Sequence, residues 1–95
     1  MDGRRVDREA AERLGRNLWM ARRRAGFSQE ALGALCSLHR TEIGLVEKGR
    51  RLPRVDTLMK LCAALDVRVE RLVEGIEWLP PGPSAGGSFA VQRRG

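Results

Sequence analysis

The chain of 95 residues is long enough for one domain with a modest core, and it leaves no room for a second, catalytic domain. It contains two Trp, two Phe and no Tyr. The core must therefore be built from Leu, Val, Ile and Ala, which favours helices over sheets. The formal net charge of +6 predicts an anionic partner, and DNA, RNA and acidic membrane surfaces all meet that condition.

Membrane insertion and secretion are not expected. No apolar run approaches the roughly 18 residues that span a bilayer, and the start of the chain, MDGRRVDREA, lacks the apolar segment of a signal peptide. We therefore expect a cytoplasmic protein with no membrane partner. Cys36 and Cys62 lie within apolar helical patterns and not at metal-ligand spacing, so we interpret them as small core residues. Neither a metal nor another cofactor is expected.

Apolar residues that recur every three or four positions predict five helices. Gly26 and Gly49 are typical helix ends, and the Ser28 hydroxyl is a suitable N-cap for the second helix. Pro53 fits just before a new helix start. The sequence therefore predicts an all-α, five-helix bundle with helices over residues 7–25, over 29–36, up to about 48, over 55–65 and over 69–73.

The composition changes after the fifth predicted helix. Residues 80–88 are rich in Pro and Gly and are interpreted as a linker, and residues 89–94 alternate weakly, like a short strand. We therefore divide the chain into a domain at 7–75 and an irregular or extended tail at 76–95. Five apolar residues of this tail have no evident place in the core and suggest that it contributes to a dimer: Ile76, Trp78, Leu79, Phe89 and Val91. The alternative is that the tail is a disordered extension.

The run from Ser28 to Gly49, SQEALGALCSLHRTEIGLVEKG, resembles the signature of the λ repressor/Cro-type (XRE-like) transcription regulators. Their pattern is S-Q-E-x-L, then an Ile, then E-[KR]-G, and Pro53 with the segment 57–65 is similar to their fourth helix. The resemblance covers residues 14–73. It implies a helix-turn-helix whose second helix enters the major groove of double-stranded DNA. It also implies a homodimer that regulates transcription, with repression preferred, on a pseudo-palindromic operator.

The resemblance implies that the third helix reads bases. If Ile43 and Val46 face inward, its outer face carries Arg40, Thr41, Gly44, Leu45 and Lys48. Arg40 is the leading base reader, because it lies in the first turn and Arg forms bidentate hydrogen bonds with guanine. Leu45 either packs on a thymine methyl group or is a tolerated surface leucine.

Contacts with the DNA backbone are expected on both sides of that helix, from Ser28, Gln29, Lys48, Arg50, Arg51 and Arg54. Gln29 is alternatively a good helix former, and the arginines are alternatively a solvated face. Arg22 and Glu47 match a family pair that ties the first helix to the end of the third. Their role would be structural.

Three residues depart from the family pattern. Ser37 stands where the turn usually has Gly, so a left-handed conformation there would cost about 1 kcal/mol more than with glycine. His39 replaces the usual Ser or Thr N-cap, and a phosphate or base contact is expected of it, not metal binding. Gly44 weakens the helix by about 0.5–1 kcal/mol relative to Ala but lets the backbone approach DNA closely.

The sequence also bears on two other classes of function. A protein-interaction module, such as an antitoxin or accessory component with secondary DNA binding, is supported by Trp78 and Phe89, which lie outside the bundle pattern. An enzyme is not expected. The chain has a single His and no Ser/His/Asp, Cys/His or phosphate-loop arrangement.

Overall fold

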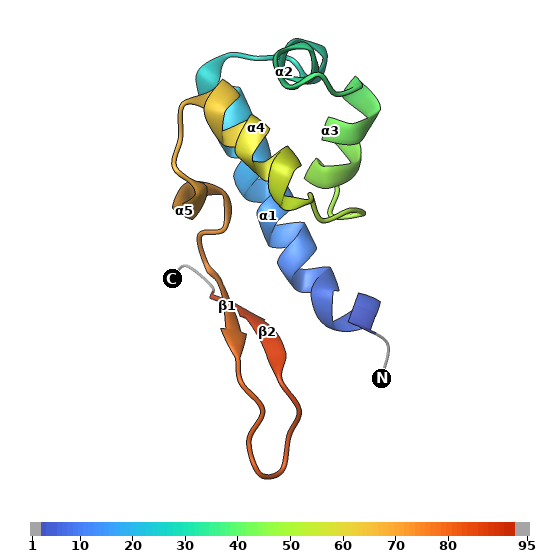
Figure 1. Ribbon diagram of the computed structural model, residues 1–95, viewed down its shortest axis with the longest axis vertical. Coiled ribbons are helices and arrows are strands. Elements are labelled where there is room, and N and C mark those ends of the chain that lie inside the picture. The colour runs from blue at the N-terminus through green and yellow to red at the C-terminus, as the bar shows by residue number, and fades with distance from the viewer. Residues whose placement is uncertain (1–2, 93–95) are drawn as a thin grey trace.

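The computed structural model describes residues 3–92, with side chains from residue 8 onward. Five helices form a bundle, and a two-stranded hairpin follows them (Figure 1). The elements are α1 (Gly3–Ala25), α2 (Gln29–Cys36), α3 (Arg40–Glu47), α4 (Val55–Leu65), α5 (Val69–Leu72), β1 (Ile76–Leu79) and β2 (Ser88–Val91). The five-helix prediction is confirmed. α1 begins four residues earlier than predicted, because apolar periodicity marks only the buried part of a helix, and Ala10 is the first buried residue among those whose side chains are described.

The core lies where all five helices converge. Each helix contributes one large side chain that is almost completely buried, and these are Leu18, Leu32, Ile43, Leu61 and Leu72, in helix order. Burial of such a side chain contributes about 1.5–3 kcal/mol. The core therefore fixes α2 and α3 against the other three helices.

The two cysteines are both free thiols. Cys36 is buried in the core and Cys62 is half-buried against it, as the apolar pattern predicted. Burial raises the pKa of both thiols, chiefly through desolvation, which disfavours the reactive thiolate. Both are therefore packing residues.

Apolar spacing alone would also put Leu35 and Val55 in the core, but they are 59% and 74% exposed. In α2 the reason is the small residue Gly33, which is buried and faces the following turn. A Cβ atom at Gly33 would lie 2.5 Å from the carbonyl oxygen of Leu38. The turn thus packs directly on the α2 backbone, and Leu35 is left on the outer side of the helix.

Residues 76–91 of the predicted tail form a hairpin, in which the short strand expected at residues 89–94 corresponds to β2, and residues 93–95 lie outside the described residues. β1 and β2 pair antiparallel, from Ile76 opposite Val91 to Leu79 opposite Ser88, and residues 80–87 form the connecting loop. β2 packs along α1, and the loop projects away from the bundle (Figure 1). Ile76, for which the sequence offered no place, packs against the core. Apolar alternation over four residues is a weak signal for a strand, and the long Pro- and Gly-rich loop gives no indication that the two strands pair.

Candidate nucleic-acid interface

Helices α2 and α3 form one unit because the turn between them is closely packed. The Leu38 amide donates to the carbonyl oxygen of Gly33 at 2.8 Å. Ser37 adopts the left-handed conformation, with φ 56° and ψ 41°, at the position where the family usually has Gly. A residue with a Cβ atom pays about 1–2 kcal/mol there. The turn is therefore strained, and the packing on both sides holds it in place.

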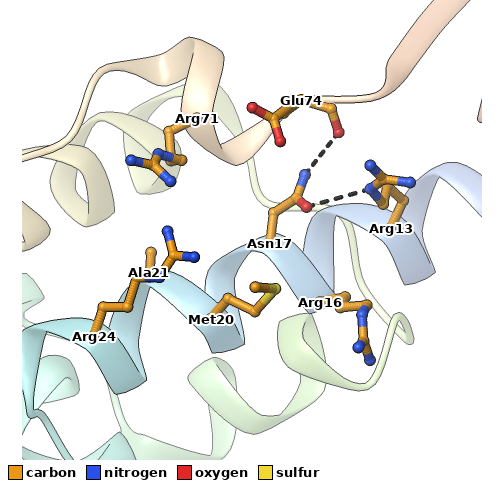
Figure 2. A pocket seen from close by; sticks show the side chains of 8 residues that line it. All are labelled: Arg13, Arg16, Asn17, Met20, Ala21, Arg24, Arg71 and Glu74. Carbon is orange, nitrogen blue, oxygen red and sulfur yellow. Dashed lines mark hydrogen bonds between the residues drawn. The ribbon is translucent and has the colours of Figure 1, made fainter. Parts of the chain in front are cut away.

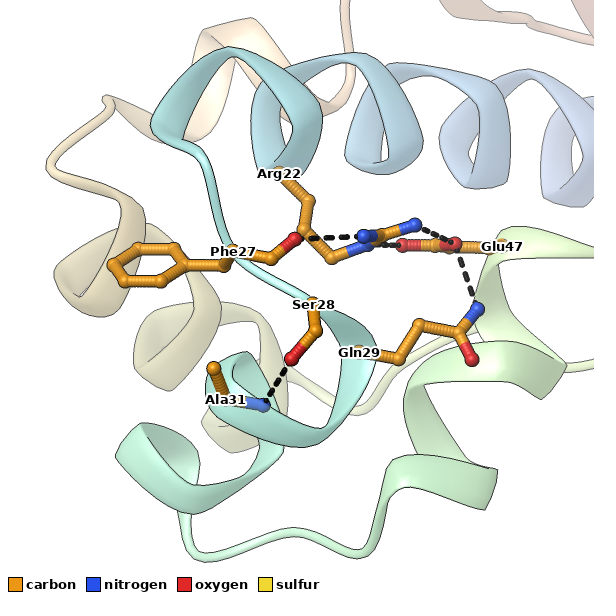
Figure 3. A network of polar contacts seen from close by, with 6 residues as sticks. All are labelled: Arg22, Phe27, Ser28, Gln29, Ala31 and Glu47. Atoms are coloured by element: carbon orange, nitrogen blue, oxygen red, sulfur yellow. Dashed lines mark hydrogen bonds and ion pairs between the residues drawn. The ribbon is translucent and has the colours of Figure 1, made fainter.

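A buried ion pair ties the end of α3 to α1 (Figure 3). Arg22 donates through Nε to Oε2 of Glu47 at 2.5 Å and through Nη2 to Oε1 at 3.0 Å. The two side chains are only 8% and 5% exposed. Arg22 also donates through Nη1 to the carbonyl oxygen of Phe27 at 2.8 Å, which fixes the approach to α2. This geometry orients α3 and leaves its outer face to solvent.

Gln29 lies in the same network, which sequence reasoning did not anticipate. Its Nε2 donates to Oε1 of Glu47 at 3.0 Å (Figure 3). Its amide also lies against Gly44. A Cβ atom at Gly44 would lie 3.6 Å from Oε1 of Gln29. The structure therefore gives Gln29 a bridging position between α2 and α3. No local pattern reveals this contact, because its two partners are 18 residues apart.

Each of the two helices begins with a side-chain cap. The Ser28 hydroxyl accepts from the Ala31 amide at 3.0 Å, so its own hydrogen is not used in the cap. At α3, Nδ1 of His39 accepts from the Thr41 amide at 3.1 Å and lies 2.8 Å from Oγ1 of Thr41. An Nδ1 that accepts places the ring hydrogen on Nε2. His39 thus caps α3 as the usual Ser or Thr would and presents an Nε2–H donor as well.

The exposed side of α3 carries the side chains expected to read bases. Arg40 and Thr41 are exposed in the first turn, whereas Gly44 and Leu45 are half-buried. Arg40 lies 3.4 Å from the carboxylate of Glu30, but both side chains are well exposed, so this pair is weak. Thr41 donates its hydroxyl hydrogen to His39, which leaves its oxygen as an acceptor.

The basic residues after α3 differ from one another in their partners. Lys48, the C-cap of α3, and Arg50 are exposed, and neither forms an ion pair with a described carboxylate. Arg54 is 88% exposed and lies 3.7 Å from Asp56. Arg51 is paired with Glu42. A phosphate would have to replace the Glu42 carboxylate at Arg51. The sequence did not reveal that Arg50, Arg51 and Arg54 differ in their partners.

No three His, Cys, Asp or Glu side chains from residue 8 to residue 92 come together as a metal site requires. None of the described helices is long and apolar enough to cross a membrane.

Comparison with known proteins places the same region in a family. A family model described as a helix-turn-helix domain matches residues 13–74. The restriction-modification controller protein C.AhdI from Aeromonas hydrophila is 33% identical over 70% of this chain and 96% of its own, with a TM-score of 0.67. A hypothetical transcription factor, NHTF, from Neisseria is 33% identical over 67% of this chain and 74% of its own, with a TM-score of 0.64.

The P22 c2 repressor, solved in complex with a synthetic operator, shares the fold at a TM-score of 0.62. It is 24% identical over 65% of this chain and 94% of its own. No curated protein matches this chain. The family model ends at residue 74, so the hairpin lies outside it.

Proposed function

Because this chain belongs to the λ repressor/XRE-type family of helix-turn-helix transcription regulators, we propose that it is a cytoplasmic repressor that binds double-stranded DNA as a homodimer. The observation that carries this proposal is the presentation of α3. The buried Arg22–Glu47 pair fixes one end of the helix, and the exposed polar side chains Arg40 and Thr41 occupy its first turn. In this motif the first turn meets base edges in the major groove.

Base reading begins with Arg40, whose guanidinium donates two hydrogen bonds to O6 and N7 of a guanine. The Thr41 oxygen accepts from an exocyclic amine of adenine or cytosine. Leu45 is half-buried, so only part of its side chain is available to contact a thymine methyl group. The missing side chain of Gly44 allows a close approach of the helix, and Nε2–H of His39 donates to a base edge or a phosphate.

Phosphate contacts hold the protein in register without reading sequence. The start of α2 offers the Ser28 hydroxyl and backbone amides, with Gln29 beside them, and the other side of α3 offers Lys48, Arg50, Arg51 and Arg54. Each phosphate neutralised by a cation releases counterions, so binding weakens as salt rises. The overall charge of +6 agrees with this role.

A homodimer places two α3 helices in successive major grooves, about 34–36 Å apart. One small domain contacts too few base pairs to be selective alone. We propose residues 7–75 as the DNA-binding domain and the hairpin within 76–95 as the dimer contact. Support comes from three exposed apolar side chains of the hairpin, which are 51%, 45% and 36% accessible in the monomer: Trp78, Leu79 and Phe89.

Selection of bound sequences from a random DNA pool tests the proposal, followed by electrophoretic shift on the selected duplex. We expect a pseudo-palindrome whose half-sites are centred about one helical turn apart. The selected duplex should bind about 10³-fold or more tightly than random DNA at the same salt. Equal affinity for both duplexes, with no enriched motif, would contradict operator binding.

A second candidate function is that of a protein-interaction module, and the hairpin favours it. Trp78 and Phe89 form an edge-to-face pair with ring centroids 5.1 Å apart, on an element that the family model does not include. Such an exposed aromatic pair suits a protein partner. The same selection separates the operator-binding proposal from an interaction module that has lost DNA binding, because such a module would enrich no sequence.

A further inference from the structure

A groove lined by arginines lies between α1 and α5, outside the helix-turn-helix (Figure 2). Its volume is about 510 Å³. The residues that line it are Arg13, Arg16, Asn17, Met20, Ala21 and Arg24 of α1, Arg71 of α5, and Glu74. Four of these eight residues are arginines and one is a glutamate, and the thioether of Met20 adds an apolar edge. The groove therefore combines positive charge with a small apolar surface.

The groove faces away from α3. With about 100° of rotation per residue, Gly15 and Arg22 project from one side of α1, and both meet the end of α3. Asn17, Met20 and Arg24 project from the opposite side by the same rotation. A duplex bound at α3 therefore lies on the far side of α1 from these residues. Contact with the same DNA therefore does not explain the positive charge of Arg24.

The arginines that line the groove outnumber its single carboxylate, that of Glu74, by four to one. Figure 2 shows the guanidinium groups of Arg24 and Arg71 directed toward each other across the groove. Neither they nor Arg16 form an ion pair with a carboxylate among the described residues. Two like charges that face each other repel, so an anion between them would be favourable. Guanidinium groups suit phosphate because they donate two parallel hydrogen bonds to it.

The two walls of the groove are held together by Asn17. Its Nδ2 donates to the carbonyl oxygens of Leu72 at 3.0 Å and Glu74 at 2.9 Å, and its Oδ1 accepts from Nε of Arg13 at 3.3 Å. Arg13 in turn donates to the carbonyl oxygen of Gln92 at 2.7 Å. The spacing between α1 and the end of α5 is thus fixed before any ligand arrives, which lowers the entropic cost of binding.

We propose that this groove binds a small phosphorylated metabolite, with its phosphate between Arg24 and Arg71 and an apolar or aromatic group beside Met20. The volume lies in the range of small-molecule sites, about 300–1,000 Å³, and is too small for a nucleic-acid duplex. This site is independent of operator recognition by α3. It gives the protein a place for a soluble effector on the surface that DNA leaves open.

Isothermal calorimetry with ADP and inorganic pyrophosphate tests the proposal, with uncharged adenosine as the control ligand. We expect saturable binding of both phosphates and weaker binding of adenosine. The double variant R24Q/R71Q should lower the affinity for ADP by at least about tenfold, because it removes charge-assisted hydrogen bonds. The matched variant R8Q/R68Q removes the same charge at two exposed arginines that line neither the groove nor the proposed DNA contact, and it should bind ADP like the parent protein. Equal losses in the two variants would overturn the proposal.

Nuclear magnetic resonance of the unaltered protein provides a measurement that does not depend on how a variant folds. Added pyrophosphate should shift the side-chain amide signal of Asn17 and the backbone amide signal of Arg71. Backbone amide signals of the hairpin loop, residues 80–87, should move much less. Shifts confined to the loop after α3, or no saturable shift up to millimolar pyrophosphate, would show an adventitious ion only and would overturn the site.

Discussion

The helix-turn-helix and the hairpin are held to the rest of the molecule in opposite ways. α2 and α3 contribute two of the five most buried side chains, and a buried ion pair and an amide bridge lock them to α1. The hairpin is anchored at its base, where Ile76 packs on the core and the Gln92 amide donates to the carbonyl oxygen of Gly75 at 2.7 Å. Its aromatic residues stay exposed.

This difference separates two kinds of surface. The helix-turn-helix turns its apolar side chains inward and presents polar groups at fixed positions, as recognition of hydrogen-bonding base edges requires. The hairpin presents apolar side chains outward, and only another apolar surface would cover them. One region is thus suited to DNA and the other to protein, and substitutions in each region should have different consequences.

The largest expected effect is the loss of the buried ion pair. Glu47→Ala leaves the Arg22 guanidinium buried without its carboxylate and removes the partner of Gln29, so we expect a loss of about 3 kcal/mol in the free energy of unfolding. Urea denaturation measures it. The control Glu42→Ala removes a more exposed pair with Arg51 and should cost less than about 1 kcal/mol. Equal losses would mean that the buried pair does not fix α3.

The packed turn of the helix-turn-helix gives the next effect. Gly33→Ala adds a methyl group 2.5 Å from the Leu38 carbonyl oxygen, and this main-chain atom can move only if the turn moves. We expect a loss of about 1–3 kcal/mol, typical of overpacking, in thermal or urea unfolding. Ala substituted at Gly82, which has open space around it, is the control and should change little. A neutral Gly33→Ala would show that the turn is loosely held.

Relief of strain in the same turn should have a smaller effect of opposite sign. Ser37→Gly removes the steric cost of φ 56° and should raise the free energy of unfolding by about 0.5–1 kcal/mol. Asp66→Gly is a matched comparison at φ 54°, and its gain should be smaller because Asp tolerates this conformation better. A loss of stability in Ser37→Gly, measured in the same denaturation series, would contradict strain at this turn.

The smallest effect on stability is expected in the hairpin. The double variant W78S/F89S replaces side chains that are 51% and 36% exposed, so unfolding should change by less than about 1 kcal/mol. At micromolar concentration, however, sedimentation should shift from dimer to monomer. The same shift is expected when the chain is truncated after Gly75. A truncated protein that still sediments as a dimer would move the interface to the helices, where Val55 and Met59 are exposed.

The contrast between the two regions also explains which features of the structure can be predicted from the sequence. Helix positions and caps follow from local signals, such as the Ser28 hydroxyl and the three- and four-residue apolar spacing, and the structure confirms them. The outer face of α3 follows from the same period once Ile43 and Val46 are placed inside. Local sequence signals are sufficient to predict these helices, because a helix forms its backbone hydrogen bonds within itself.

Contacts between distant segments could not be predicted from the sequence patterns. Gln29 meets Glu47 across 18 residues, and Arg13 meets Gln92 across 79. The hairpin depends on such contacts for its position, and its four-residue strands give almost no periodic signal. The pairing of Arg51 with Glu42 likewise depends on how the loop after α3 folds back. Sequence patterns predict which face of each element is apolar, whereas packing determines which distant segments that face contacts.

The central claim is that α3 reads bases and the loop beyond it holds phosphates, and fluorescence anisotropy of two variants at several salt concentrations tests it most directly. Arg40→Ala should cost about 1–3 kcal/mol per half-site on the selected operator, relax preference at one base pair and matter much less on random DNA. Arg50→Ala should weaken operator and random DNA alike and reduce the magnitude of the salt slope by about one for each phosphate that is no longer neutralised. If Arg40→Ala instead reduces both affinities equally with base preference unchanged, α3 does not read sequence through Arg40.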